Sequence, residues 1–441
     1  MQRSGGSGFS GTVMRGCTSI SRKNHSINGL VMIEAMSAMQ RSLLNIIHRK
    51  TSCYQTFLKA RHLCTSQMKL SIEAEPSEKA GSFRMRRWQF DGYSGLDGVV
   101  LANVRVPPIL KPGDVLVKVS AASVNPLDTA MLGGYGSGML NIMRMMSQLE
   151  QGIADMNHIE FPLTVGRDFA GEVVAIGHGV TDMSIGDKVF GVVSPHCQGS
   201  HAEYVVTSSS NVTSIPEGIS PEDAASLPYV GLTAYSATVI SGLLTPGRAL
   251  GKRVLVLGAS GGVGTFLCQM LSGWGAEVVG VCSADAMELV LSLGATHTLD
   301  YRDPATKEIL LGDAGFDLVI DAAGTDDIDY VKSLRPWVGA SYVTLSPPFL
   351  HNADNLGIAG GVVKSLRQVV CKNATILTEG RAYKWAFYMP NPWALKHIAS
   401  LLKTNKIRAV IDKVFPFEEV PAAYETLLNG HTRGKIVIKV S

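Results

Sequence analysis

The sequence of 441 residues has no closely spaced pair of cysteines and no long apolar run. Its seven cysteines are scattered without a Cys-x-x-Cys pair, which argues against a structural zinc knuckle and against a dithiol redox motif. No stretch approaches the roughly 20 apolar residues that a membrane-spanning helix needs. Charged residues make up only 17% and hydrophobic residues 46%, so we expect most of the chain to fold around sizeable cores.

Acidic residues are nearly missing from the N-terminal segment. Residues 1–66 hold nine Lys/Arg and one acid, Glu34, and residues 36–72 hold no acid. The net charge of residues 1–66 is therefore +8. Because the whole chain has a net charge of +3, residues 67–441 have a net charge of −5. Such a basic segment predicts a mitochondrial presequence, with residues 1–35 as an upstream extension, and the alternative is a disordered basic tail. The acidic remainder disfavours a nucleic-acid-binding surface.

Residues 83–214 consist of short strand-like runs separated by Gly/Pro turns, which predicts a β-rich module. Strands are expected at 115–120, 171–176, 188–193 and 202–206. The middle of this module, residues 133–159, is helix-like and rich in methionine. Methionines usually fill cores, and the alternative is a pliable lid that faces a substrate or a membrane.

From about Pro221 strands and helices alternate, which predicts a doubly wound parallel sheet and an α/β fold. Helices are expected at 224–240, 263–274 and 286–293, and strands at 254–257, 277–281, 318–321 and 342–345. Residues 435–440 are strand-like again, and we expect them to return to the first module.

The strongest chemical signal is the glycine-rich turn G-A-S-G-G-V-G at 258–264, between a predicted apolar strand and a predicted helix. Glycines let the backbone turn sharply and approach a pyrophosphate without a Cβ in the way. The N-terminus of the following helix offers free N–H groups and a positive dipole end to the phosphates. In this strand–turn–helix context the turn predicts a dinucleotide site.

The end of the next strand discriminates between the two nicotinamide dinucleotides. NAD-binding sites usually place Asp or Glu there to bind the ribose 2′-hydroxyl. Here the strand ends in Val281-Cys282-Ser283, and Ser283 can donate a hydrogen bond to a 2′-phosphate. NADPH is therefore the expected cofactor, and the nearby Asp285 is the argument for NAD.

Several segments resemble the zinc-free quinone oxidoreductase branch of the medium-chain dehydrogenase/reductase superfamily. They are A-A-S-V-N-P-L-D at 121–128, F-P-L-T-V-G-R-D at 161–168, G-D-K-V-F-G at 186–191, A-S-L-P-Y-V-G-L-T-A-Y at 225–235, K-R-V-L at 252–255, K-W-A-F at 384–387 and G-H-T-R-G-K at 430–435. The resemblance implies a GroES-like β-rich catalytic domain, 83–214 completed by 408–441, and a Rossmann NADPH-binding domain, 215–407. It covers the chain from about residue 85 onward.

Zinc-dependent members of the superfamily carry a cysteine near Pro126 and Gly-His-Glu where this chain has Gly166-Arg167-Asp168. Two of the three ligand positions thus lack a thiolate or imidazole donor, and the four-cysteine lobe is missing. The resemblance therefore predicts no metal site.

The resemblance also implies a set of NADPH contacts: Ser260, Gly262, Val263, Ser283, Tyr301, Leu345, Tyr388, His431 and Arg433. Three of these have an alternative interpretation. Tyr301 would flank the adenosine or be a half-buried core tyrosine. His431 and Arg433 would contact the cofactor or be ordinary surface groups.

The resemblance implies hydride transfer from NADPH to a quinone or a related electron-poor carbonyl, in a mitochondrial protein linked to ubiquinone metabolism. Without zinc, a hydrogen-bond donor beside the developing oxyanion would help. The predicted catalytic residues are Asn125 and Tyr135, with Tyr229 as a further donor and Asp128 as an orienting carboxylate. Asn125 has the alternative of shaping the Asn-Pro turn.

A non-enzymatic alternative is an NADPH-binding scaffold. The resemblance implies a reticulon-type membrane protein as a partner, beside a small-molecule, quinone-like substrate and a homodimer. Nucleic-acid binding, which occurs in some zinc-free relatives, is disfavoured by the acidic body of the chain.

Overall fold

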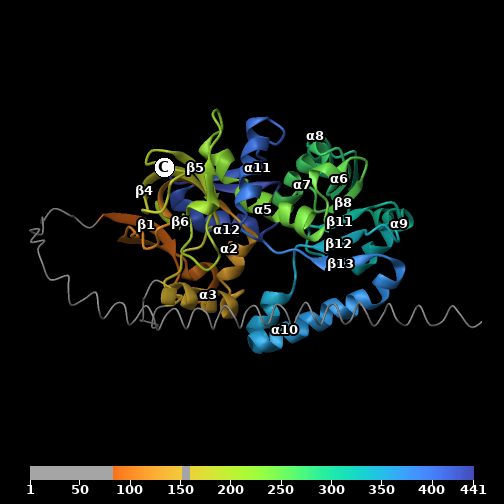
Figure 1. The fold of residues 1–441 in the computed structure, drawn as a ribbon, viewed down its shortest axis with the longest axis horizontal. Coiled ribbons are helices and arrows are strands. Elements are labelled where there is room, and N and C mark those ends of the chain that lie inside the picture. The colour runs from red at the N-terminus through yellow and green to blue at the C-terminus, as the bar shows by residue number, and fades with distance from the viewer. Residues whose placement is uncertain (1–82, 151–158) are drawn as a thin grey trace, which may run out of the picture. The chain divides into compact units, whose positions relative to one another are not determined.

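The computed structural model describes residues 83–150 and 159–441. The predicted presequence, residues 1–66, and residues 151–158 of the methionine-rich segment lie outside the described residues. The described chain is built on two large sheets, one on each side of Figure 1, and a short antiparallel ribbon of β1 (Arg84–Gln89) and β2 (Val100–Arg105).

The first sheet has seven strands in the order β14-β15-β3-β4-β5-β7, with β6 paired to β3. Its strands are β3 (Asp114–Val124), β4 (Asp168–Ile176), β5 (Lys188–Val192), β6 (Tyr204–Ser208), β7 (Val212–Ser214), β14 (Ile411–Pro416) and β15 (Lys435–Lys439). The C-terminal strand β15 runs antiparallel to β3, with Val437 opposite Ser123. The last residues of the chain thereby lie beside a strand more than 300 positions earlier in the sequence.

The second sheet has six parallel strands in the order β10-β9-β8-β11-β12-β13. They are β8 (Arg253–Leu257), β9 (Glu277–Cys282), β10 (His297–Asp300), β11 (Leu318–Asp321), β12 (Ser341–Thr344) and β13 (Ala382–Trp385). In β8, Val254, Leu255 and Val256 are all fully buried. Consecutive apolar residues are expected in a parallel sheet because helices cover both of its faces.

The helices of the described chain connect and cover these sheets. They are α2 (Pro126–Met131), α3 (Ser137–Glu150), α4 (Pro221–Ala225), α5 (Pro228–Tyr235), α6 (Pro246–Ala249), α7 (Gly262–Gly273), α8 (Met287–Ser292), α9 (Pro304–Gly312), α10 (Phe349–Ile376), α11 (Pro392–Lys403) and α12 (Val420–Leu428). Many begin at a proline, because the missing N–H is not needed in the first turn and the fixed φ suits a helix.

Two sequence predictions need correction. The single helix expected at 224–240 is interrupted, because Pro228 has no N–H and its ring clashes with a continuing helix. The chain instead forms α4, α5 and a π-helical segment Ser236–Ser241. The expectation that the methionines fill the core is wrong for Met143 and Met146 of α3, which are exposed.

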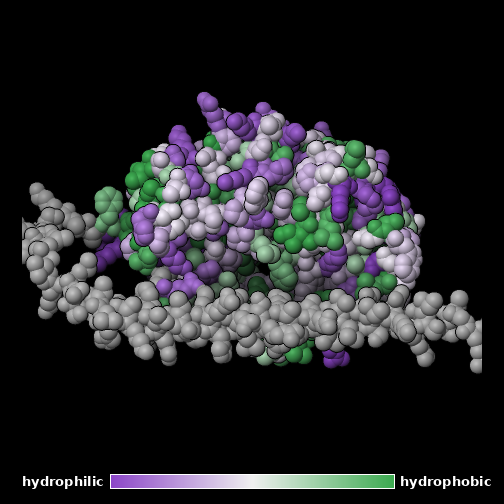
Figure 2. All heavy atoms as spheres, viewed as in Figure 1, coloured by the Kyte–Doolittle hydropathy of each residue, from purple (hydrophilic) through white to green (hydrophobic). Residues whose placement is uncertain are grey.

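The α/β class and the doubly wound parallel sheet predicted from the sequence are confirmed. The domain boundaries at residues 214 and 407 stay a prediction. Among the described residues, no helix is both long enough and apolar enough to span a membrane. On the face shown in Figure 2, hydrophilic and hydrophobic residues are mixed over both sheets, and the surface is hollowed between them.

Candidate active site

The carboxyl edge of the parallel sheet gathers the residues expected to bind the dinucleotide. Ser283 directly follows β9, Tyr301 follows β10 and Leu345 follows β12, while Tyr388 lies three residues past β13. The carboxyl ends of parallel strands meet at one edge, which is where open α/β sheets bind ligands. The fold therefore brings residues spread over more than 100 positions to one edge.

The glycine turn between β8 and α7 requires its glycines. Gly258 has a left-handed φ of 77°. A Cβ on Gly264 would lie 2.1 Å from the Gly258 carbonyl oxygen, so any larger residue would push the turn apart. α7 begins at Gly262, and its first turn presents N–H groups that have no partner inside the helix. The turn thus has the form of a phosphate-binding loop.

The segment before β15 packs onto this turn. The Gly434 N–H donates to the Ser260 carbonyl at 2.9 Å, and Gly434 bridges to Gly261. This contact brings the neighbouring residues His431 and Arg433 to the glycine turn. His431 is exposed and has a left-handed φ of 61°.

Arg433 pairs with Asp285, two residues past Ser283. The carboxylate that argued for NAD is thus neutralised by a guanidinium from the C-terminal segment. The Arg433 side chain is 38% accessible and is held at the end of β9 by this ion pair. The end of β9 therefore combines the Ser283 hydroxyl with a cation that a 2′-phosphate could compete for.

Tyr301 lies beside the same strand end, because its N–H donates to the Cys282 carbonyl at 3.1 Å. Tyr301 is 55% exposed, so it is not a core tyrosine. The Arg302 guanidinium lies 5.4 Å from the ring centroid. The exposed ring is available to flank an adenosine.

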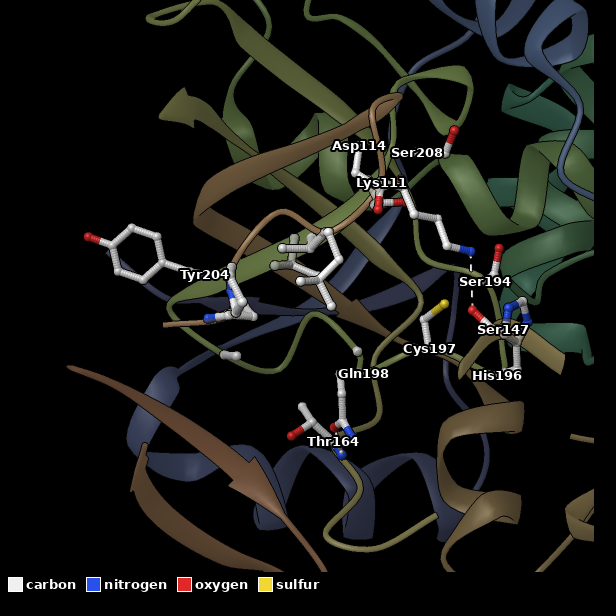
Figure 3. Close-up of a pocket in the computed structure, with 18 of the residues that line it drawn as sticks. Lys111, Asp114, Ser147, Thr164, Ser194, His196, Cys197, Gln198, Tyr204 and Ser208 are labelled. Atoms are coloured by element: carbon white, nitrogen blue, oxygen red, sulfur yellow. Dashed lines mark hydrogen bonds between the residues drawn. The ribbon is translucent and has the colours of Figure 1, made fainter. Parts of the chain in front are cut away.

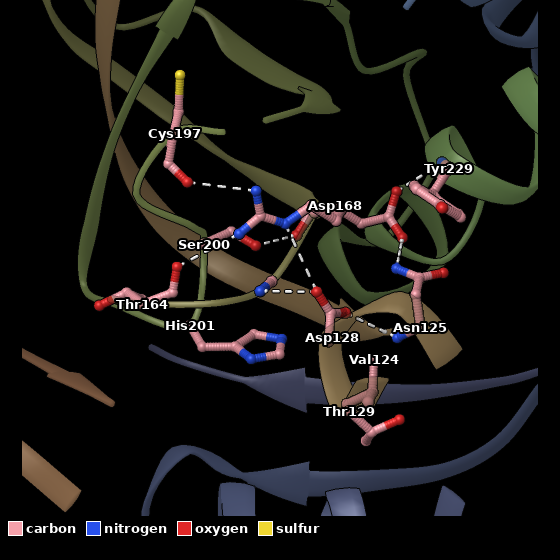
Figure 4. A network of polar contacts seen from close by, with 12 residues as sticks. Val124, Asn125, Asp128, Thr129, Thr164, Asp168, Cys197, Ser200, His201 and Tyr229 are labelled. Atoms are coloured by element: carbon pink, nitrogen blue, oxygen red, sulfur yellow. Dashed lines mark hydrogen bonds and ion pairs between the residues drawn. The ribbon is translucent and has the colours of Figure 1, made fainter. Parts of the chain in front are cut away.

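A buried polar network lies between β3, β4 and α5 (Figure 4). At its centre is Asp168, which is fully buried. Its carboxylate accepts hydrogen bonds from Ser123 Oγ at 2.6 Å, from Asn125 Nδ2 at 2.8 Å and from the Tyr229 N–H at 2.6 Å. These bonds hold the start of α5 against β4.

A second buried carboxylate, Asp128, stabilises the turn into α2. It accepts the Asn125 N–H at 2.8 Å and the Gly166 N–H at 2.9 Å. The Arg167 guanidinium lies 3.6 Å from it and donates to the Ser194 carbonyl at 2.8 Å. Asp128, predicted to orient a catalytic group, therefore orients the backbone at Asn125.

Lys435, the first residue of β15, is the network member that sequence reasoning missed. Its ammonium donates to Asn125 Oδ1 at 2.6 Å and to the Val124 carbonyl at 2.9 Å, and lies 3.5 Å from Asp168 Oδ2. Burial lowers the pKa of Lys435 and raises the pKa of Asp168, while their attraction acts in the opposite direction. The available signal was a lysine at the start of a strand whose three middle residues are apolar.

Lys435 also connects this network to the glycine turn. A Cβ on Gly262 would lie 3.0 Å from Lys435 Cδ, so the lysine stem passes directly over the first residue of α7. The polar network and the expected cofactor loop therefore border each other.

The predicted catalytic residues differ in whether their polar side-chain atoms are already hydrogen-bonded within the protein. Both polar ends of the Asn125 amide are bonded within the network, so Asn125 shapes the α2 turn and fixes neighbouring groups. Tyr135 and Tyr229 are half-buried, and burial raises the pKa of each hydroxyl. Tyr229 stacks on Tyr388 with ring centroids 4.3 Å apart, and the buried Tyr388 hydroxyl has no hydrogen-bond partner. Tyr135 and Tyr229 are therefore more available than Asn125 as hydrogen-bond donors to a substrate.

The residues at the position of the zinc site in metal-dependent relatives do not fit a zinc ion. Arg167, a cation, stands where a histidine ligand would be, and Asp128 and Asp168 are occupied by backbone and side-chain donors. Within the described ranges 83–150 and 159–441, no cluster of three or more His, Cys, Asp or Glu side chains could hold a metal.

A separate pocket of about 550 Å³ lies in the β-rich part of the chain (Figure 3). All of its lining residues fall between Met85 and Asn211, among them Lys111, His196 and Cys197. None comes from the carboxyl edge of the parallel sheet. This pocket is therefore distinct from the expected cofactor site.

Comparison with known proteins agrees with this geometry. Residues 111–217 match the alcohol dehydrogenase GroES-like domain, and residues 293–438 match the zinc-binding dehydrogenase family. The chain is 42% identical over 363 residues to the bovine mitochondrial NAD(P)H oxidoreductase RTN4IP1, covering 81% of this chain and 89% of the relative. It is 40% identical over 402 residues to the human protein of that name, covering 88% and 99%. The chain belongs to the RTN4IP1 family of mitochondrial NAD(P)H oxidoreductases.

The solved structures place the RTN4IP1 family fold in the same superfamily. A quinone oxidoreductase from Coxiella burnetii is 28% identical, with a TM-score of 0.63, covering 81% of this chain and all of that one. The fold is thus a GroES-like β-rich part with a Rossmann-type parallel sheet. The protein is a mitochondrial oxidoreductase of the medium-chain dehydrogenase/reductase superfamily that uses a nicotinamide cofactor.

Proposed function

We propose that this enzyme transfers hydride from NADPH to a quinone or a related electron-poor carbonyl compound without zinc, in a step of ubiquinone metabolism. The observation that carries the proposal is the position of Lys435, whose stem lies over Gly262 and whose ammonium lies against Asn125 and Asp168. The buried ammonium group of Lys435 thereby borders the cofactor loop, in a site whose residues do not fit a metal ion.

The preference for NADPH rests on the end of β9. Ser283 places a hydroxyl at the position where NAD-binding proteins usually carry a carboxylate. Asp285 is held by Arg433, so its charge is compensated and a guanidinium lies nearby. A 2′-phosphate would find both a donor and a cation there. The remaining proposed contacts are Ser260, Gly262, Val263, Tyr301, Leu345, Tyr388 and His431.

When bound, NADPH supplies the hydride. The protein's part is to hold the acceptor ring against the cofactor and to stabilise the negative charge that appears on its oxygen. The stacked rings of Tyr229 and Tyr388 offer a flat apolar surface for a planar acceptor. The hydroxyls of Tyr229 and Tyr135 are proposed to donate to the acceptor oxygen. A tyrosine hydroxyl is protonated at neutral pH, and burial raises the pKa of both further. Asn125 and Lys435 position the backbone beside them.

The relatives support a quinone as the substrate class. One relative, from Arabidopsis thaliana, is named a chloroplast envelope quinone oxidoreductase homologue. It is 29% identical over 359 residues, and the alignment covers 80% of this chain and 98% of the relative. The Coxiella burnetii structure carries the quinone oxidoreductase name as well.

A second candidate function is an NADPH-binding scaffold for a reticulon-type membrane protein. The observation that favours it is the name of a Caenorhabditis elegans relative, reticulon-4-interacting protein 1, mitochondrial, which is 34% identical over 360 residues. We also propose that the protein forms a homodimer, because it resembles the medium-chain dehydrogenase/reductase superfamily.

The deciding experiment follows NADPH absorbance while the purified chain is offered a series of short-chain quinones and electron-poor enones. Turnover with quinones, and its loss in Tyr229→Phe at unchanged NADPH affinity, is expected. Tight NADPH binding without turnover on any acceptor would contradict the proposal and favour the scaffold.

A further inference from the structure

Helix α10 (Phe349–Ile376) carries a surface that the proposed reaction does not use. It packs against α3 and β13 and lies along the lower edge of the molecule in Figure 1. Its two parts meet at Gly357, where the backbone leaves the helical conformation with φ 69° and ψ 170°. The second part, residues 358–376, follows the free edge of the parallel sheet.

The inner side of α10 is fixed to the edge strand β13. Asn373 Nδ2 donates to the Tyr383 carbonyl at 2.9 Å, and the Tyr383 N–H donates to Asn373 Oδ1 at 2.9 Å. Lys372 pairs with Asp326 and donates to the Tyr383 hydroxyl at 3.2 Å. The side-chain amide thus occupies both outward backbone groups of Tyr383, so another strand cannot pair there. The buried residues Gly361, Ser365 and Ile376 lie on the same side of the helix as Lys372, which identifies the inner side of α10.

The outward side is apolar over several turns. We call it the α10 apolar face, and it consists of Val362, Val363, Leu366 and Val370 of α10 and of Leu377, which directly follows the helix, with exposed fractions of 43%, 68%, 37%, 51% and 58%. Their spacing places them on one side of the helix. Exposed apolar side chains in a continuous stripe indicate a surface that binds something.

Positive charge borders this face. Lys364 and Arg367 are both exposed, and within the described chain neither forms an ion pair or a hydrogen bond. Residues 357–376 contain no Asp or Glu. An apolar face with basic residues beside it is the pattern of helices that lie in the surface of an anionic membrane.

We propose that the α10 apolar face docks on an anionic phospholipid surface, with the helix lying in the interface. α10 has 28 residues but does not have the apolar character of a membrane span. A second copy of the chain fits the face less well. A twofold axis would set the basic flank of one α10 beside that of the other, and no acid on residues 357–376 would compensate. Anionic head groups complement Lys364 and Arg367 directly.

The test is flotation of the full chain with vesicles of phosphatidylcholine, with and without phosphatidylglycerol. Because residues 1–66 are strongly basic and could bind anionic vesicles themselves, the comparison is between variants that share them. Val363→Asp adds a charge to the α10 apolar face, and Ile309→Asp adds the same charge to an exposed residue on α9, with 57% of Ile309 accessible. Equal NADPH affinity of both variants shows that they are folded.

Val363→Asp is expected to weaken binding to the anionic vesicles at least tenfold, while Ile309→Asp binds as the wild type does. Lys364→Gln and Arg367→Gln are each expected to weaken it about fivefold, and only for the anionic vesicles. Unchanged vesicle binding by Val363→Asp would overturn the proposal. The proposal would also be overturned if the wild type sedimented as a dimer and Val363→Asp sedimented as a monomer. The α10 apolar face would then bind a second copy of the chain.

Discussion

Arg433 and Asp285, 148 positions apart in the sequence, form an ion pair at the carboxyl end of β9. The pair joins the segment before β15 to the end of β9, where Ser283 is proposed to bind the 2′-phosphate of NADPH. It places a guanidinium beside Ser283 and removes the free carboxylate that would repel a 2′-phosphate. We therefore expect the proposed preference for NADPH to depend on the C-terminal segment as well as on β9.

Arg433→Gln is expected to weaken NADPH binding about 10- to 100-fold, the range of a charge-assisted hydrogen bond of roughly 1.5–3 kcal/mol. NADH binding should change little, since NADH has no 2′-phosphate. The matched control is Arg335→Gln, because Arg335 pairs with Asp317 at a similar exposure and lies at the opposite edge of the sheet. Titration calorimetry with both nucleotides measures the effect, and an equal loss for NADH would contradict the assignment.

Ser283→Asp is expected to weaken NADPH at least tenfold, or about 1.4 kcal/mol, through repulsion of the 2′-phosphate. NADH binding should be unchanged or tighter. Ser292→Asp on the exposed side of α8 adds the same charge as a control. If wild type binds both nucleotides equally and Ser283→Asp alters neither, Ser283 does not contact the 2′ position.

Lys435→Met is expected to lower the free energy of unfolding by about 3–5 kcal/mol, because it leaves the buried Asp168 without its cation. The double variant Lys435→Met/Asp168→Asn should recover part of this loss, since the unpaired charge is then gone. Urea denaturation of the wild type, the two single variants Lys435→Met and Asp168→Asn, and the double variant gives the comparison. Additive losses in the double variant would show that the two groups are not coupled.

His201 predicts a pH dependence of stability. Its ring is fully buried, Nε2 lies 3.2 Å from the Ser123 carbonyl, and Nδ1 contacts the Tyr424 hydroxyl. Since a carbonyl only accepts, the neutral ring donates from Nε2 and accepts at Nδ1. Burial lowers the pKa of His201 from 6.5. Between the lowered pKa and 6.5 the unfolded chain binds a proton that the folded chain does not, so stability falls as pH drops below 6.5.

The loss from His201 is expected to reach at most about 1.4 kcal/mol per pH unit. It should be absent from His201→Gln and retained in His178→Gln, where the histidine is exposed. Urea titrations at pH 7.5 and at successively lower pH measure the slopes. Identical slopes for wild type and His201→Gln would rule out a contribution from this ring.

The purified protein is expected to hold no stoichiometric zinc, because Arg167 occupies a ligand position and its guanidinium cannot bind a cation. Elemental analysis after removal of loosely bound metal checks this. A content near one zinc per chain would contradict the zinc-independent reaction. A chelator should likewise leave turnover unchanged.

Local sequence determined the α/β class, the glycine turn and most strand positions of the parallel sheet. These features depend on neighbouring residues: apolar runs form buried strands, and Gly258 and Gly264 are needed wherever this turn occurs. Ser283 could be placed from the sequence for the same reason, because it directly follows the strand after the glycine turn. The interrupted helix at Pro228 was also readable, but the apolar pattern of residues 224–240 concealed it.

Tertiary structure alone decided which distant residues meet. Lys435 reaches Asn125 and Asp168 because β15 pairs with β3, and that pairing brings together positions some 310 apart in the sequence. Arg433 reaches Asp285 because the same segment packs on the glycine turn. Such contacts follow from burial and hydrogen bonding of the whole sheet, so no local pattern encodes them. The sequence placed the residues of the cofactor loop, and the fold supplied the charges that surround it.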